Sequence, residues 1–414
     1  MVAAVTFGCD QSGIIRPPTV PQDLIGQTRP LTQSQQSLID GVYAVDEGSG
    51  MFGDSVAIRR SGNKITVYTG KKSGHMIFQV GNLDSVIMFV GYWKYQNSNE
   101  TGLVQAYMKR EEGGSYIMST GTEPAPAQRL IRLFLGEGTN LPSEALKLRY
   151  VRPFSQKAID DVNNFILIGH RCGGRMSDGI PHSENTIEMA MASEELGCNG
   201  IEVDIRKSKD GVLYLYHDNT INPRLVRKNT LVGATEDYTW PVLSSEVTLI
   251  WGEKMPTLEA FLDAVITKTE VVFVYLDTKT VGDGIIADMI PIQQAALAKA
   301  QSLGRNIKIY IGIPNADLLD ELKQIPNYKD QQTLIETSPD DCIDVNGKVW
   351  SPRWSDGTQN ENITRLKGLG KTCICWTVDV PQYIDNYLFQ PEPGRFNGFL
   401  SNYAMYAKFK LLMQ

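Results

Sequence analysis

The sequence has few of the features that mark specialised protein classes. Its six cysteines include no Cys-x-x-Cys pair, and the spacing of Cys373 and Cys375 suits neither a zinc ribbon nor an easy disulfide. It has no long basic run and its net charge is −7, so it does not resemble a nucleic-acid binder. The longest apolar stretch, 86–93, is far shorter than the roughly 18 residues of a membrane-spanning helix. We therefore expect no small disulfide-stapled scaffold, no nucleic-acid partner and no transmembrane span.

What remains is the composition of an ordinary globular protein. With 414 residues, of which 42% are hydrophobic and 21% charged, the chain can form two or three domains with sizeable cores. Residues 1–150 carry 14 Lys and Arg and 13 Asp and Glu, so the acidic excess lies in residues 151–414. Any phosphate bound by that acidic part needs cationic side chains close to it.

The amino terminus, MVAAVTFGCDQSG, has a short apolar run that ends at Gly8-Cys9, and a polar stretch follows as far as Pro30. This pattern resembles the end of a bacterial lipoprotein signal, although no basic segment precedes the apolar run. The alternative is a frayed terminus with an incidental cysteine. Our hypothesis is export with a lipid anchor at Cys9, which predicts an extracytoplasmic location, with residues 1–35 as a signal-like segment and linker.

Residues 36–150 predict a small all-β domain. Short runs of β-branched and aromatic residues alternate with Gly, Asn and Ser turns, at 42–45, 55–59, 64–68, 76–80, 85–95, 102–109 and 115–119. Antiparallel strands of this kind form a barrel or a sandwich. We expect 124–146 to be a helical or irregular connector, because apolar residues in 127–135 recur at a helix-like spacing.

The front domain shows no catalytic spacing. His75 follows Gly74 and is expected in a surface turn. Tyr92, Trp93 and Tyr95 either line a sugar or lipid groove or belong to the core.

Residues 151–414 predict an α/β domain with a parallel sheet, because short apolar strands alternate with amphipathic helices. The candidate strands are 165–169, 200–205, 271–276, 308–311, 333–335, 349–351, 373–378 and 398–400. Eight such strands fit a (β/α)8 TIM-type barrel, which typically takes about 250 residues. Helices are expected over 184–196, 257–267 and 283–303, with Ser183 as the cap of the first.

Three carboxylates are expected at the mouth of this barrel. Glu202 and Asp204 share a face of one strand, because side chains at i and i+2 point the same way, and Asp277 follows a second strand. Burying three carboxylates together is costly unless a cation neutralises them. Hard oxygen ligands favour Ca²⁺ or Mg²⁺, so we expect one divalent cation of this kind.

Two of the four histidines, His170 and His217, are also expected at strand ends of this barrel. Imidazoles titrate near neutral pH and can act as an acid and base pair. Arg171 and Lys279 supply cationic donors for a phosphate, although Lys279 has the alternative of an ion pair with Asp277.

An ordered set of motifs resembles the glycerophosphodiester phosphodiesterases. The motifs are His170-Arg171, Glu184-Asn185-Thr186, the run from Gly197 to Ile205, Ser208-Lys209-Asp210-Gly211, His217-Asp218, Pro256-Thr257-Leu258-Glu259, Leu276-Asp277-Thr278-Lys279, Trp376-Thr377-Val378-Asp379 and the run from Asn397 to Asn402. Their order and spacing match the family across nearly all of 165–405, which makes the signal specific.

The resemblance implies a metal-dependent hydrolase that cleaves a small-molecule phosphodiester to an alcohol and a phosphomonoester such as glycerol 3-phosphate. It implies an acid and base pair at His170 and His217, cation ligands at Glu202, Asp204 and Asp277, phosphate contacts at Arg171 and Lys279, and a mouth aromatic at Trp376. For Trp376, a place in the core is the alternative. In this family a substrate hydroxyl is thought to attack first, and water then opens the cyclic phosphate.

Two positions depart from the family pattern. Cys172 stands where the family usually has Gly, and Asp277 replaces the usual Glu, which shortens its reach by roughly 1.5 Å. Related phospholipase D toxins that cleave sphingolipids also use Asp there. A phospholipase-type cleavage that stops at the cyclic phosphate is therefore the second interpretation, and a non-catalytic lipid or glycan binder is the third.

Overall fold

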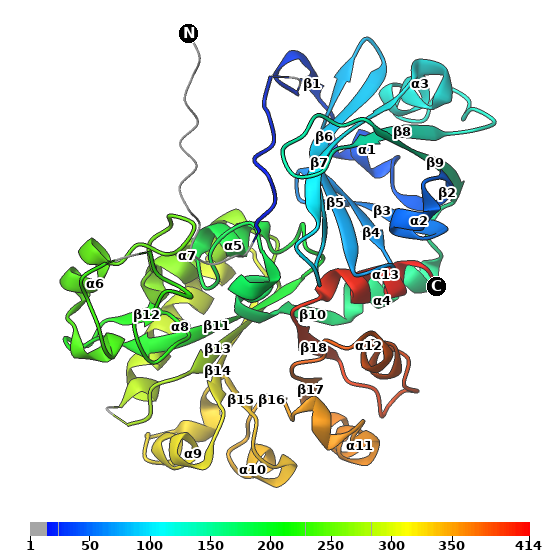
Figure 1. Cartoon of the computed structure of the whole chain (residues 1–414). Coiled ribbons are helices and arrows are strands. Elements are labelled where there is room, and N and C mark those ends of the chain that lie inside the picture. Colours follow the sequence, from blue (N-terminus) through cyan, green and yellow to red (C-terminus); the bar gives the residue numbers. More distant parts are fainter. Residues whose placement is uncertain (1–14, 24, 228, 283) are drawn as a thin grey trace.

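The computed structural model describes residues 15–414 except 24, 228 and 283, so Cys9 and its proposed anchor lie outside the described residues. The chain forms two barrels, one after the other (Figure 1). Among the helices in the described part of the chain, none combines the length and the apolar character needed to cross a membrane.

The front domain is a closed antiparallel β-barrel in which each strand pairs with the next and β9 pairs with β2. Its strands are β2 (Gly41–Glu47), β3 (Ser55–Ser61), β4 (Lys64–Thr69), β5 (Gly74–Leu83), β6 (Val86–Tyr95), β7 (Thr101–Met108), β8 (Leu130–Leu135) and β9 (Glu144–Arg152). The short β1 (Arg29–Pro30) adds to β5, and α1 (Gln33–Ser37), α2 (Ser49–Phe52) and α3 (Gly114–Met118) accompany the barrel.

Two of the secondary-structure elements expected in the front domain were wrong. The expected strand 115–119 is helix α3, whose backbone closes helical hydrogen bonds such as that from Ile117 N–H to the carbonyl of Gly113. The expected connector 124–146 contains β8 and the start of β9, which close the barrel. In β8, Ile131, Leu133 and Leu135 join the barrel core, so tertiary pairing overrides the apparent helical spacing.

The structure also shows where the histidine and the aromatic residues singled out in the front domain lie. His75 is not in a surface turn, because β5 begins at Gly74 and the buried His75 ring packs edge to face on Tyr92. Trp93 and Tyr95 belong to the barrel core, and Tyr92 belongs to the cluster shared with the back domain. The core interpretation is therefore confirmed for Trp93 and Tyr95, whereas Tyr92 also lines a cleft between the two domains.

The back domain is the expected (β/α)8 barrel, closed by parallel pairing of β10 with both β11 and β18. Its strands are β10 (Ile166–Gly169), β11 (Gly200–Lys207), β13 (Phe273–Thr278), β14 (Lys308–Ile313), β15 (Thr333–Ile335), β16 (Val349–Trp350), β17 (Thr372–Cys375) and β18 (Gly398–Ser401). An added strand, β12 (Leu213–Leu215), runs antiparallel to the end of β11.

Helices surround this barrel (Figure 1). They are α4 (Gln156–Asn164), α5 (Ile187–Ala192), α6 (Trp240–Glu246), α7 (Leu258–Lys268), α8 (Ile285–Ser302), α9 (Ala316–Lys323), α10 (Pro339–Asp344), α11 (Asn360–Gly368), α12 (Pro381–Leu388) and α13 (Ala404–Leu412). Helix α5 is shorter than predicted and is capped by Thr186, not Ser183, whose hydroxyl donates to Glu253.

The two domains pack against each other through α13, which lies against β4 (Figure 1). The side chains of Tyr68 and Tyr92 from the front barrel join the apolar cluster of the back domain. Lys64 forms an ion pair with Glu195 at 2.6 Å. Since apolar and charged contacts both cross the interface, the front domain is a packed part of the molecule.

Candidate active site

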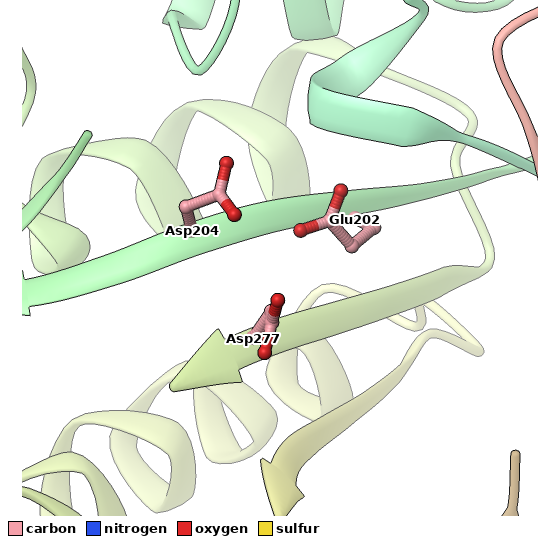
Figure 2. Close-up of side chains that lie close together, drawn as sticks. All are labelled: Glu202, Asp204 and Asp277. Atoms are coloured by element: carbon pink, nitrogen blue, oxygen red, sulfur yellow. The ribbon is translucent and has the colours of Figure 1, made fainter. Parts of the chain in front are cut away.

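Three carboxylates meet at the carboxyl ends of neighbouring strands (Figure 2). Glu202 and Asp204 point to one side of β11, and Asp277 on β13 is the register partner of Asp204. One oxygen of each lies within 4.8 Å of the others. The expected juxtaposition of these three residues is confirmed.

The hydrogen bonding of this carboxylate cluster is incomplete. Glu202 Oε2 accepts from the Arg171 N–H at 2.8 Å, and Asp204 Oδ2 accepts from Asn185 Nδ2 at 2.7 Å. By contrast, Glu202 Oε1 and Asp277 Oδ1 are buried without a hydrogen-bond partner among the described residues. Such oxygens are costly unless a cation satisfies them, and a set of three carboxylates suits a hard divalent ion. The donor set therefore fits Ca²⁺ or Mg²⁺.

Burial and mutual repulsion perturb these acids. Burial, followed by the charges of Asp204 and Asp277, raises the pKa of Glu202 well above its ordinary value. Burial likewise raises the pKa of Asp277. For Asp204 burial acts in the same direction, but the Lys279 ammonium and other nearby cations outweigh it and hold its pKa below the ordinary value. Two of the three carboxyls thus resist ionisation until positive charge is supplied.

Lys279 lies within the cluster. Its Nζ is 3.0 Å from Asp204 Oδ1 and pairs with Asp277. Burial disfavours its charge, yet the surrounding carboxylates raise its pKa above the ordinary value, so it remains an ammonium group. The predicted pairing with Asp277 is present, and the same ammonium lies beside the proposed cation ligands.

His170 follows β10, and its ring is held in one orientation. His170 Nδ1 lies 2.9 Å from Asn402 Oδ1. Because Asn402 donates its Nδ2 to Asp379 at 2.7 Å, its Oδ1 is the acceptor, and Nδ1 of His170 carries the proton. The lone pair is therefore on Nε2, which lies 3.9 Å from Glu202 Oε2. Burial and the Arg171 charge lower the pKa of His170 to about 3, which keeps the ring neutral.

His217 differs in detail from the prediction. It follows the added strand β12 and not one of the eight parallel strands. The backbone N–H of Tyr216 donates to the Asp204 carbonyl at 3.0 Å, which brings this segment beside the cluster. His217 Nδ1 lies 2.6 Å from Asp218 Oδ1, so Nε2 is again the free ring nitrogen. Burial opposes ionisation of Asp218, but hydrogen bonds from His217 and Arg224 hold its pKa below its usual range.

A buried ion network links the two histidine segments. Glu184 accepts from Arg171 Nη1 at 2.7 Å and from Arg224 Nη1 at 3.0 Å. Arg224 Nε also donates to Asp218 Oδ2 at 3.0 Å. Arg171 Nε is buried without a hydrogen-bond partner among the described residues and lies 3.7 Å from Asp204 Oδ2. The network fixes Arg171 and Asp218 relative to each other.

Cys172 adopts a left-handed backbone conformation with φ 77°. Glycine adopts this conformation without strain, which accounts for the glycine that usually occupies this position in the family that the sequence resembles. The side chain is buried, and burial raises the pKa of its thiol well above the ordinary value. A reactive thiolate is therefore disfavoured at Cys172.

Trp376 follows β17 at the same end of the barrel. It is half-buried and packs against the apolar interior of the barrel. Its Nε1 donates to the Ser351 carbonyl at 3.0 Å, and the Arg353 guanidinium lies 4.8 Å from the ring centroid. Trp376 therefore packs against the core and also has the Arg353 guanidinium next to its ring.

Sequence reasoning missed the residues that hold the site in place. Asn402 and Asp379 lie in motifs that carry the resemblance, but the sequence does not show that Asn402 contacts His170 or that Asp379 accepts hydrogen bonds from Asn402. Nothing in the sequence around Gln96 indicates that it supports the site. Its Nε2 donates to the Asn402 carbonyl from the front domain, 306 residues away in the chain.

The back domain is similar to known proteins in sequence and in structure. The model of the "Glycerophosphoryl diester phosphodiesterase family" matches residues 170–390. No curated protein sequence matches the chain. A glycerophosphodiester phosphodiesterase from Parabacteroides distasonis is similar in structure, with 20% identity, a TM-score of 0.47, and coverage of 60% of this chain and 97% of its own.

A phosphodiesterase from Oleispira antarctica, solved in complex with the product sn-glycerol-3-phosphate, has 15% identity and a TM-score of 0.46, and the match covers 63% of this chain and 100% of its own. The family match spans more than half of the chain and extends from His170 to beyond Trp376. The chain therefore belongs to the glycerophosphoryl diester phosphodiesterase family and is a phosphoric diester hydrolase.

Proposed function

We propose that the protein hydrolyses glycerophosphodiesters to an alcohol and glycerol 3-phosphate, with one divalent cation and with His170 and His217 as the acid and base pair. One observation supports this most directly. Buried carboxylate oxygens without partners lie beside two imidazoles, each of which has Nδ1 held by an acceptor and Nε2 free. That arrangement provides a cation site and two proton-transfer atoms together.

The cation ligands would be Glu202, Asp204 and Asp277. A bound Ca²⁺ or Mg²⁺ would polarise a phosphoryl oxygen and offset negative charge in the transition state. Lys279 and Arg171 add positive charge near the phosphate, and Trp376 lies at the mouth where the leaving group enters.

The two histidines take different roles in this proposal. Neutral His170 accepts the proton of the attacking hydroxyl at Nε2. His217, whose Nδ1 is held by the Asp218 carboxylate, donates its Nε2 proton to the leaving alcohol oxygen. If a substrate hydroxyl attacks first, the product is a cyclic phosphate, and the two residues exchange roles when water opens it.

The first expected result concerns the cation and the product. A chelator should abolish release of glycerol 3-phosphate from a panel of glycerophosphodiesters, and excess Ca²⁺ or Mg²⁺ should restore it. Phosphorus NMR of the reaction identifies the product. A cyclic phosphate that accumulates without opening would instead support the phospholipase-type alternative suggested by the short Asp277, and full activity in chelator would contradict the cation proposal.

The second expected result concerns the front domain. Gln96→Ala removes the hydrogen bond to the Asn402 carbonyl, and Asn402 orients His170. We expect kcat to fall about fivefold with little change in KM, since a lost buried hydrogen bond of about 1 kcal/mol loosens the base and not substrate contacts. Gln105→Ala on β7 is the control, and equal kinetics in the two variants would contradict this positioning role.

A further inference from the structure

A large cleft lies between the two domains and is separate from the catalytic residues. Its volume is about 1900 Å³, and none of the proposed site residues lines it. Its walls include Asn199 and Val272, which precede β11 and β13, whereas the catalytic side chains follow the carboxyl ends of the barrel strands. Ligand pockets usually have roughly 300–1,000 Å³, so the cleft has room for a small molecule.

The cleft is basic although the protein is acidic. Seven Lys or Arg residues and four Glu residues line it, whereas the chain as a whole has a net charge of −7. A local excess of positive charge in an acidic protein attracts anions to that position.

Two cations in the cleft form no ion pair with a residue that the structure describes. Lys408 on α13 is 9% exposed and forms no hydrogen bond or ion pair with any described residue. Arg59 on β3 contributes a buried Nη1 that likewise has no hydrogen-bond partner in the described part of the chain. Burial, followed by the charge of Arg59, lowers the pKa of Lys408 to about 7. The Glu194 carboxylate also acts on Lys408, but it accepts a hydrogen bond from the Glu270 N–H.

Buried cations without partners are costly, and an oxyanion between an Arg and a Lys removes that cost through charge-assisted hydrogen bonds. The carboxylate and phosphate groups both match these donors.

The same cleft has an apolar part. Met191, Val272 and Leu303 line it, and these side chains are 48%, 42% and 54% exposed. Large apolar side chains gathered in one cleft with basic residues indicate a ligand with both an apolar and an anionic part.

We propose that this cleft binds an anionic amphiphile, whose phosphate or carboxylate head lies between Lys408 and Arg59 and whose chain lies along Met191, Val272 and Leu303. The front barrel and the hydrolase barrel then share a second ligand site. It does not depend on the proposed catalytic roles, because none of its residues belongs to the catalytic cluster.

Isothermal titration calorimetry of the full chain in chelator tests the proposal, with decyl phosphate, decanoate, neutral 1,2-decanediol and inorganic phosphate below their micelle concentrations. We expect decyl phosphate or decanoate to bind at least about tenfold more tightly than the diol or inorganic phosphate, since both parts contribute. The tighter of the two anions identifies the head group. No saturable binding of either anion, or equal affinity for the diol, would overturn the proposal.

Variants locate the binding. Lys408→Met and Arg59→Met should each weaken the preferred anion about tenfold or more, because each removes a charge-assisted contact. Lys408→Met should also raise the Tm of the ligand-free protein, since an unpaired buried charge is removed, so its lost affinity cannot reflect unfolding. Lys329→Met, at an exposed lysine, is the matched control and should bind as wild type. If Lys279→Met loses binding and Lys408→Met keeps it, the anion occupies the catalytic site and the proposal is wrong.

Discussion

Replacing Glu202 with glutamine is expected to lower turnover by roughly a hundredfold or more, because removal of even an outer partner of a metal ligand costs 10–100-fold. The amide keeps the shape of the side chain and can still accept from the Arg171 N–H, so the fold is retained. It cannot supply the negative charge that balances a divalent cation. Initial rates at saturating Ca²⁺ and Mg²⁺ measure the effect, and turnover close to that of wild type would contradict the cation site.

Thermal unfolding separates lost cation binding from lost stability. A ligand at about 100 times its Kd stabilises the native state by about 2.7 kcal/mol, so cation should raise the Tm of the wild type. In chelator, Glu202→Gln should unfold at a Tm no lower than that of wild type, and cation should not raise its Tm. Asp356→Asn, which changes an exposed carboxylate outside the cluster, is the matched control and should respond as wild type.

In chelator, the Tm difference between Glu202→Gln and wild type should depend on pH. Because burial and like charges raise the folded pKa of Glu202, its carboxyl contributes stability that is fully present below its ordinary pKa. This contribution is lost as pH rises through the folded value. Glutamine does not ionise, so the Tm of the variant relative to wild type should increase as pH rises. A difference that is constant or falls with pH would show that Glu202 is not destabilised by ionisation.

The sequence predicts the barrel well because its strands are short apolar runs separated by helices. All eight predicted strands of the back domain occur, and the spacing of Glu202 and Asp204 correctly places both on one face of β11. The front barrel is less predictable, because β8 owes its conformation to pairing with β7 and β9. Its local spacing alone favours a helix over that stretch, and barrel closure decides otherwise.

The candidate catalytic residues can be predicted from the sequence, whereas the residues that form hydrogen bonds with them cannot. A histidine after a strand is visible in the sequence, but the tautomer of His170 depends on Asn402, which is 232 residues away. Asn402 in turn contacts Gln96 of a different domain. Such contacts arise from how α13 and the front barrel pack, and nothing in the local pattern around Gln96 encodes them.

His170→Ala and His217→Ala are each expected to lower turnover on glycerophosphodiesters by about a hundredfold or more, since a positioned acid or base contributes 10²–10⁴-fold. Each variant removes an imidazole whose Nδ1 is held and whose Nε2 is free, so the loss should appear in kcat. Steady-state kinetics with saturating cation measure it. His182→Ala, at a loop histidine that contacts Glu253, is the control and should retain full activity.

The leaving group distinguishes the two roles. With a glycerophosphodiester that releases 4-nitrophenol, the leaving oxygen departs as a stable anion and needs no proton, so His217→Ala should recover most of its activity. His170→Ala should stay impaired, because the attacking hydroxyl still has to lose its proton to a base. If only His170→Ala recovered its activity, His170 would be the acid and His217 the base. If both variants recovered equally, neither residue would act specifically on the leaving group. The neutral His170 ring and the Asp218 carboxylate beside His217 together favour the first outcome.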